Sequence, residues 1–202
     1  FKTQMQYFID IKIKGSNVIE KIYAEEMPVP FLSIITNDCI SKGKDYNGGG
    51  ARYNTKYLQG VGIGTITDCL AAVKYNVFDK KTFTMEELMQ ALDDNFEGHE
   101  RILNLVRNKT PKYGNDDDYA DDIMKDVFEF YRSQVTGRPN MLGGMYRINM
   151  LPTTCHVYFG DVMMASPNGR LAHKPVSEGI SPEKGADVNG PTAVVKSCAK
   201  MD

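Results

Sequence analysis

Asp45-Tyr-Asn-Gly-Gly-Gly-Ala-Arg-Tyr-Asn54 is the most distinctive stretch of this 202-residue sequence. Its three consecutive glycines, Gly48 to Gly50, have no Cβ, so the backbone there can adopt positive φ angles or approach another segment closely. Arg52 and Tyr53 follow directly and place a cation and an aromatic ring beside the bend. Composition favours a glycine-rich turn between two elements, although glycines beside an arginine could equally form an anion site.

Known nucleotide-binding loops do not fit this region. A P-loop ends in Gly-Lys-Ser/Thr, and that ending is missing here. Gly60-Val-Gly-Ile-Gly64 lacks the G-x-G-x-x-G spacing of a dinucleotide-binding fold. We therefore expect Gly48 to Arg52 to fix the approach of chain segments near one another without binding a nucleotide.

Bulk composition is typical of an ordinary globular domain. The chain is 42% hydrophobic and 25% charged, which is enough to bury a sizeable core. The formal net charge is -2 and no basic stripe stands out, so no nucleic acid partner is expected. Apolar runs are too short to span a membrane, and the first residues lack the apolar region of a signal peptide.

Metal-binding patterns are also missing from the sequence. The acidic run from Asn115 to Asp122 fails as an EF-hand counted from Asp116, because positions six and twelve are Asp121 and Val127. The cysteines and histidines are scattered and include no C-x-x-C pair: Cys39, Cys69, Cys155, Cys198, His99, His156 and His173. We expect no bound metal or cofactor, reduced thiols and a cytoplasmic protein.

Hydrophobic spacing predicts a mostly helical N-terminal half. Apolar residues recur at helical spacing from Phe1 to Met27, where Pro28 and Pro30 end the helix. A short helix is expected over 31–42, and another begins at Thr65, which is interpreted as its N-cap. Thr84 with Glu87 forms a capping box before a further helix. His99, in a helix over 97–107, is interpreted as a surface or interfacial histidine.

The second half combines helices with one clear strand. Asn115 is expected to cap a helix whose first turn carries carboxylates. Tyr146 to Met150 alternates apolar and polar residues, which predicts a strand, whereas 157–164 fits either a short helix or a second strand. Ser166 to Gly169 fits a type I turn, and 171–187 is expected to be a loop. Asn189 and Pro191 then begin a last helix.

Several short motifs occur in one order along the chain. The first group is Pro30-Phe-Leu-Ser33, Asn37-Asp-Cys39, Gly43-Lys-Asp45 and Gly49-Gly-Ala-Arg-Tyr-Asn54. The second group is Asn95-Phe-Glu-Gly98, Pro111-Lys-Tyr-Gly-Asn-Asp116, Leu151-Pro-Thr-Thr-Cys-His-Val-Tyr-Phe-Gly160, Ser166-Pro-Asn-Gly-Arg170, Ser177-Glu-Gly-Ile-Ser-Pro182, Gly190-Pro-Thr-Ala193 and Lys196-Ser197. Together they resemble the glycyl radical enzymes of the pyruvate formate-lyase type. The likeness is greatest to the branch of glycerol, choline and hydroxyproline lyases.

The resemblance implies a ten-stranded β/α barrel made of two half-barrels, with residues 1–202 as a mostly helical central segment of that domain. In this family a backbone radical on a C-terminal glycine generates a thiyl radical on a cysteine. Those residues lie in Arg-Val-x-Gly-Tyr and Gly-Cys-x-Glu motifs, and neither motif occurs in this sequence. We therefore expect no catalytic residue here, and both ends look internal to a longer protein.

Thr153 and Thr154 are the candidate substrate-binding residues. They follow the predicted strand, and adjacent residues at a strand end point to opposite faces, so both cannot face inward. The resemblance places this strand end inside the barrel, where one hydroxyl could contact the substrate. Alternatively, both hydroxyls cap the segment that starts at Cys155. Cys39, Cys69 and Cys198 are expected to be structural, and Cys155 is left open because of its position.

The resemblance implies a lyase that removes water from trans-4-hydroxy-L-proline. Its glycyl radical, outside this chain, would be installed by a radical S-adenosylmethionine activating enzyme, and the full-length protein would be a homodimer. A second interpretation changes the substrate to glycerol or another diol, choline or pyruvate. A third is a non-catalytic helical module. The flanking sequence separates these classes, because an enzyme of this family needs both radical motifs.

Overall fold

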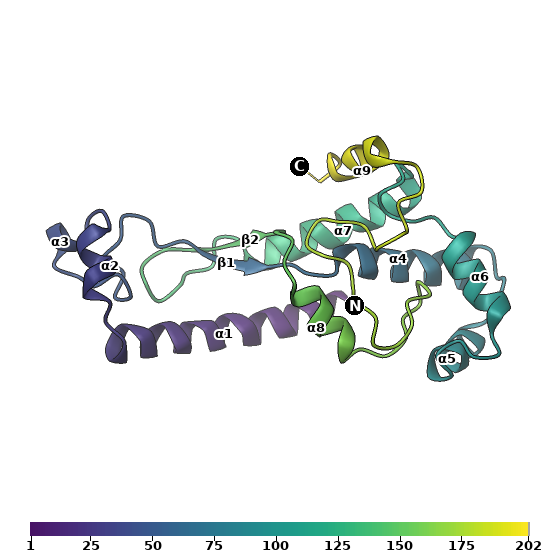
Figure 1. The fold of residues 1–202 in the computed structure, drawn as a ribbon, viewed down its shortest axis with the longest axis horizontal. Coiled ribbons are helices and arrows are strands. Elements are labelled where there is room, and N and C mark those ends of the chain that lie inside the picture. The colour runs from purple at the N-terminus through teal and green to yellow at the C-terminus, as the bar shows by residue number, and fades with distance from the viewer. Residues whose placement is uncertain (202) are drawn as a thin grey trace. The chain divides into compact units, whose positions relative to one another are not determined.

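The computed structural model describes residues 1–201 and is mostly helical (Figure 1). The chain forms two compact units. Unit 1 comprises Phe1–Leu58 and Phe130–Asn149, and unit 2 comprises Gln59–Glu129 and the residues from Met150 onward. No helix within residues 1–201 has the length and apolar character needed to cross a bilayer.

Unit 1 begins with one long helix, α1 (Lys2–Glu26). It continues through Gly15, where a Cβ would meet open space, and it ends just before Pro28 as the sequence predicted. Its buried residues are Ile9, Ile13 and Glu20. The Glu20 carboxylate accepts a hydrogen bond from the Met141 amide at 3.1 Å, so α1 is fixed to the loop before the second strand.

The expected helix over 31–42 is wrong as a single element. It is divided into α2 (Pro30–Ile35) and α3 (Cys39–Lys42). Asp38, between them, has φ 77°, a left-handed conformation that a continuous helix does not allow. Its carboxylate accepts a hydrogen bond from Arg52 at 2.8 Å. The arginine thereby anchors this break in the chain.

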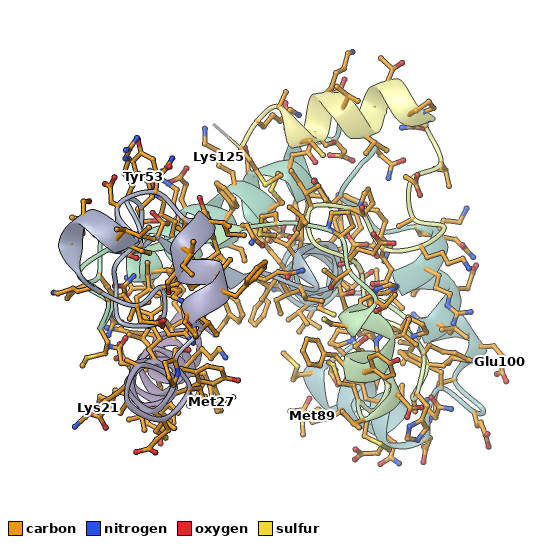
Figure 2. The ribbon with its side chains drawn as sticks, turned by 60° about the vertical axis from the view of Figure 1, so that its left-hand side comes forward. Lys21, Met27, Tyr53, Met89, Glu100 and Lys125 are labelled. Atoms are coloured by element: carbon orange, nitrogen blue, oxygen red, sulfur yellow. The ribbon has the colours of Figure 1, made fainter. Side chains whose placement is uncertain are left out.

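The glycine-rich stretch forms the predicted tight turn. The amides of Gly48 and Gly50 both donate to the Asp45 carbonyl at 2.9 Å, and Gly49 has φ 85°. A Cβ on Gly49 would lie 2.6 Å from the Leu142 carbonyl oxygen, so two distant segments touch there backbone to backbone. Tyr53 lies at the outside of unit 1 and is 83% exposed (Figure 2).

A two-stranded sheet joins β1 (Lys56–Gln59) and β2 (Tyr146–Asn149). The predicted strand from Tyr146 is therefore confirmed. Tyr146 is buried and donates its hydroxyl to the Asn17 side chain at 2.8 Å, while Arg147 is exposed, as the alternating sequence indicated.

Unit 2 begins with α4 (Ile63–Val73) and continues directly into a π-helical segment, η1 (Lys74–Asp79). α5 (Met85–Asp93) and α6 (Glu100–Asn108) follow. The Thr84–Glu87 capping box is confirmed, because each side chain accepts the other residue's amide. A single apolar cluster packs these helices together: Ala72, Phe83, Leu88, Ala91, Phe96, Ile102 and Val106.

His99 occupies the N-cap position of α6 and lies 2.9 Å from the Asp94 carboxylate. It is half-buried, in keeping with the surface or interfacial role expected for it.

Two expected N-caps are wrong. Thr65 lies inside α4, whose N-cap is Gly62, and its hydroxyl accepts the distant Ser177 amide at 2.7 Å. Asn115 lies before α7 (Asp118–Val135), but its side chain accepts the amides of Val188 and Asn189. In both cases tertiary contacts use the polar group that the local pattern assigned to a helix end.

The structure of the C-terminal part decides between a helix and a strand for residues 157–164. Residues 157–164 are not a strand, because α8 (Cys155–Asp161) is helical and is followed by irregular chain. The last helix, α9 (Pro191–Cys198), has Gly190 rather than Asn189 at its N-cap. Figure 1 shows α9 beside the start of α7, where Lys200 donates to Asp121 at 2.8 Å.

Candidate functional site

The segment that carries the candidate threonines begins where β2 ends. Gln59, the last residue of β1, donates its side-chain amide to the Leu151 carbonyl at 2.7 Å and to the Thr153 hydroxyl at 3.1 Å. One glutamine therefore fixes both the backbone of this segment and the orientation of Thr153. Sequence reasoning missed Gln59, because nothing near it in the sequence indicates a partner 94 positions away.

Thr153 and Thr154 have different environments. Thr153 is half-buried, and its hydroxyl already accepts the hydrogen bond from Gln59. Thr154 is exposed and occupies the N-cap position of α8, but its side chain makes no capping hydrogen bond. The idea that the Thr154 hydroxyl caps this helix is therefore wrong. Within residues 1–201 its hydroxyl keeps both its donor and its acceptor capacity for another group.

A loop over residues 174–182 supports this segment from behind. The Ile180 amide donates to the Met150 carbonyl at 3.1 Å, and the Val176 amide donates to the His156 carbonyl at 3.2 Å. Gly179 lies so close to Met150 that a Cβ would overlap the carbonyl oxygen. The threonines are consequently held on rigid backbone at both sides of the strand end.

Thr65 and Ser177 fix that loop to α4. The Ser177 amide donates to the Thr65 hydroxyl at 2.7 Å, while the Thr65 amide donates to the Ser177 hydroxyl at 3.0 Å. Both residues are buried. The Thr65 hydroxyl also donates to the Glu183 carboxylate. Thr65 therefore uses its hydroxyl for a tertiary contact and not for the helix cap that its sequence context suggested.

Arg170 organises the chain between α8 and the loop. Its guanidinium donates to the carbonyls of Leu171 at 3.1 Å and Lys174 at 2.7 Å, and also to that of Met164. The predicted turn over 166–169 precedes it, with the Gly169 amide donating to the Ser166 carbonyl at 2.9 Å. Its Nε also donates to the Ser166 hydroxyl at 3.1 Å, so the buried guanidinium is surrounded by protein oxygens.

Arg170 also lines a charged cleft of about 430 Å³ in unit 2. Asp68 is fully buried in its wall, and one carboxylate oxygen accepts the Tyr113 amide at 2.9 Å. The other oxygen has no hydrogen-bond partner within residues 1–201 and lies 3.9 Å from the Lys112 ammonium. Burial raises the pKa of Asp68 to about 7, against the opposing attraction of Lys112. Burial likewise raises the pKa of Glu183 and lowers that of Lys112.

The cysteines do not form a reactive cluster. Cys39 and Cys69 are buried, and burial raises the pKa of the Cys69 thiol to about 11. Cys198 lies 3.1 Å from the Tyr113 hydroxyl, at a packing contact between α9 and the chain before α7. Cys155 opens α8 and is half-buried. Residues 1–201 contain no group of three acidic, histidine or cysteine side chains suited to a metal ion.

Comparison with known proteins identifies the fold that this arrangement belongs to. A family model described as "Pyruvate formate lyase-like" matches residues 1–160. The chain belongs to the pyruvate formate lyase-like family. The expected fold class, a mostly helical piece of that family's β/α barrel, is thereby confirmed.

Relatives within the pyruvate formate lyase-like family are close in sequence and structure. Trans-4-hydroxy-L-proline dehydratase of Clostridioides difficile is 71% identical over 202 residues, which cover 100% of this chain and 26% of that protein. The crystal structure of that dehydratase with trans-4-hydroxy-L-proline bound has a TM-score of 0.96 and the same coverage. A glycerol-bound, B12-independent glycerol dehydratase of Clostridium butyricum is 40% identical, with a TM-score of 0.93 over 100% of this chain and 25% of that one. This chain therefore spans about a quarter of the length of these relatives.

Proposed function

We propose that this chain is the central segment of a glycyl radical dehydratase that removes water from trans-4-hydroxy-L-proline. The observation that carries the proposal is the 71% identity to the Clostridioides difficile dehydratase over all 202 residues. The glycerol dehydratase shares 40% identity at a TM-score of 0.93, so the backbone is common to both while the side chains match the hydroxyproline enzyme better. Side chains determine which substrate is bound, so sequence identity is the more informative quantity here.

In this proposal residues 1–202 supply scaffold and part of the pocket wall of the pyruvate formate-lyase-type domain. Radical intermediates must be shielded from water and from stray hydrogen donors, so rigid walls are part of the mechanism. The strand end with Thr153 and Thr154 fits such a wall, because Gln59 and the loop over 174–182 fix its backbone. Thr154 is the residue we assign to the substrate, since its hydroxyl is not used within the described chain.

The radical chemistry itself is assigned to residues outside this chain, because the sequence lacks both radical motifs. A radical S-adenosylmethionine activating enzyme would install the glycyl radical, and the full-length protein would act as a cytoplasmic homodimer. Membership of the pyruvate formate lyase-like family is what supports these assignments.

The test uses a full-length polypeptide that contains this chain. The protein is activated anaerobically with its activating enzyme, a reductant and S-adenosylmethionine, and the glycyl radical is quantified by electron paramagnetic resonance. It is then offered trans-4-hydroxy-L-proline, glycerol and choline separately. We expect dehydration of the proline derivative to a pyrroline carboxylate and little turnover of the other two. Preferred turnover of glycerol or choline at full radical content would contradict the substrate assignment.

A further inference from the structure

We propose that the charged cleft of unit 2 binds the carboxylate or phosphate group of a small anionic molecule, separately from the dehydration reaction. The cleft is lined by α6, the Ser166 to Arg170 turn and the loop around Glu183. Neither Thr153 nor Thr154 is among its lining residues. Its volume of about 430 Å³ lies in the range of small-molecule sites, roughly 300–1,000 Å³.

The charges around this cleft favour an anion. Five cationic side chains line it and only two carboxylates, Asp68 and Glu183, oppose them. The cations are Arg107, Lys112, Arg170, Lys174 and Lys184. A concave wall of one predominant sign concentrates counter-ions, because the surrounding protein is less polarisable than water. A cationic ligand would meet net repulsion here.

The donors on the cleft wall are not all used by the protein. Arg170 has little donor capacity left for a ligand, because three backbone carbonyls and the Ser166 hydroxyl accept its hydrogen bonds. Arg107 gives only its Nε hydrogen, to the Gly169 carbonyl at 2.9 Å, which leaves the outer end of the guanidinium. The ammonium groups of Lys174 and Lys184 make no ion pair with another residue of the described chain and are exposed.

The cleft wall contains one buried ammonium and one buried carboxylate oxygen that do not contact each other directly. Lys112 donates to the Asn168 carbonyl at 3.0 Å, while its ammonium lies 3.9 Å from the unpartnered Asp68 oxygen. That separation is too long for a hydrogen bond, and an inserted oxygen could contact both groups. Lys112 would donate to it, and the neutral form of Asp68 would donate as well, since a protonated carboxyl is a donor.

The groups facing Asp68 make that neutral form accessible. Lys112 and Glu183 are its charged neighbours, Cys69 adjoins it on α4, and Arg107 of α6 faces Lys112 across the cleft. An anion between Lys112 and Asp68 adds negative charge beside Asp68 and favours the protonated carboxyl. Binding of acetate, whose charge is constant over this range, should therefore become tighter as the pH falls from 8 to 6. Phosphate itself takes up a proton over the same range, so its affinity does not report on Asp68 alone.

The experiment is calorimetric titration of the full-length polypeptide, without activation, with inorganic phosphate and separately with acetate. Because no radical is needed, failure here is distinct from failure of the proposed dehydratase activity. We expect saturable binding of at least one probe, and the stronger of the two identifies the headgroup. In Lys174→Gln and Lys184→Gln the affinity should fall about threefold or more, because each change removes a positive charge beside the anion.

Lys109→Gln is the matched control. Lys109 is an exposed lysine at the end of α6 that does not line the cleft, so its replacement changes the net charge equally. Unchanged affinity in this control with loss in the two cleft variants supports the site. The proposal is overturned if neither probe binds saturably, if all three variants lose affinity equally, or if acetate does not bind more tightly at lower pH.

Discussion

Replacing Asp68 by asparagine should make the protein more stable at neutral and alkaline pH. The asparagine keeps the shape of the side chain and the oxygen that accepts the Tyr113 amide at 2.9 Å. It removes the cost of ionising a carboxyl group that has no exposed surface and no hydrogen bond to its second oxygen. The amide hydrogens of the asparagine face Lys112 at the former site of that oxygen, which limits the gain.

The size of the effect follows from the shift in the pKa of Asp68 from 3.8 to about 7. About three pKa units correspond to roughly 4 kcal/mol of free energy of unfolding. Since the folded-state pKa is raised, the stabilisation from the neutral carboxyl is fully present below pH 3.8 and is lost as the pH rises through 7. Between pH 5 and pH 8 the parent should lose about 2–3 kcal/mol through this group, and the variant should not.

The assay is urea unfolding at pH 5 and pH 8, monitored by far-ultraviolet circular dichroism. It compares the unsubstituted protein (the parent) with Asp68→Asn and with the exposed control Asp93→Asn. We expect the difference in unfolding free energy between the two pH values to shrink in Asp68→Asn and to match the parent in the control. The reasoning is refuted if Asp68→Asn keeps the parent's pH dependence, or if it is less stable than the parent at pH 8. Either result would mean that Lys112 keeps Asp68 ionised throughout.

Three further predictions use other parts of the chain. The 202-residue chain alone, incubated with an activating enzyme, reductant and S-adenosylmethionine, should give no protein radical, and a doublet assigned to one of its glycines would contradict this. Cys69→Ala in the full-length enzyme should lower the free energy of unfolding by about 1 kcal/mol, because the side chain is buried, and should leave radical yield and kcat unchanged. Loss of turnover in a folded variant would show that Cys69 is a catalytic thiol. Nucleotides should not bind saturably at Gly48 to Arg52, because the Arg52 guanidinium already donates to the Asp38 carboxylate and thereby lowers the pKa of Asp38. Micromolar binding that is lost in Arg52→Ala would overturn this.

Local signals in the sequence predicted the elements whose stabilising contacts are also local. The Thr84–Glu87 capping box spans three positions, and the alternation at Tyr146 needs only the strand itself. The same reasoning failed at Thr65 and Asn115. Their polar groups bind Ser177 and the Val188–Asn189 backbone, 112 and 73–74 positions away, and no local pattern contains that information.

The candidate site likewise combines features that local sequence predicts with features that depend on distant contacts. The predicted strand end lies just before Thr153 and Thr154, as β2 does in the structure. Only the structure distinguishes the two residues, through the Gln59 contact to Thr153 and the missing cap at Thr154. The charged cleft gave no sequence signal. Asp68 accepts a hydrogen bond from the Tyr113 amide, 45 positions away, and no local pattern predicts that contact. Buried charge is a property of the folded chain and is visible only once its neighbours are in place.

We propose that Thr154 contacts the substrate of the full-length enzyme. The most direct measurement compares kcat/KM for Thr154→Val and Thr153→Val in the activated full-length enzyme, at equal radical content and with folding checked by thermal unfolding. We expect a loss of roughly tenfold or more for Thr154→Val, because a hydroxyl contact that is buried against substrate contributes on the order of 1 kcal/mol or more, and a smaller loss for Thr153→Val. If both variants turn over like the parent, or lose activity only by unfolding, these threonines do not contact the substrate and the assignment of this segment to the pocket wall is wrong.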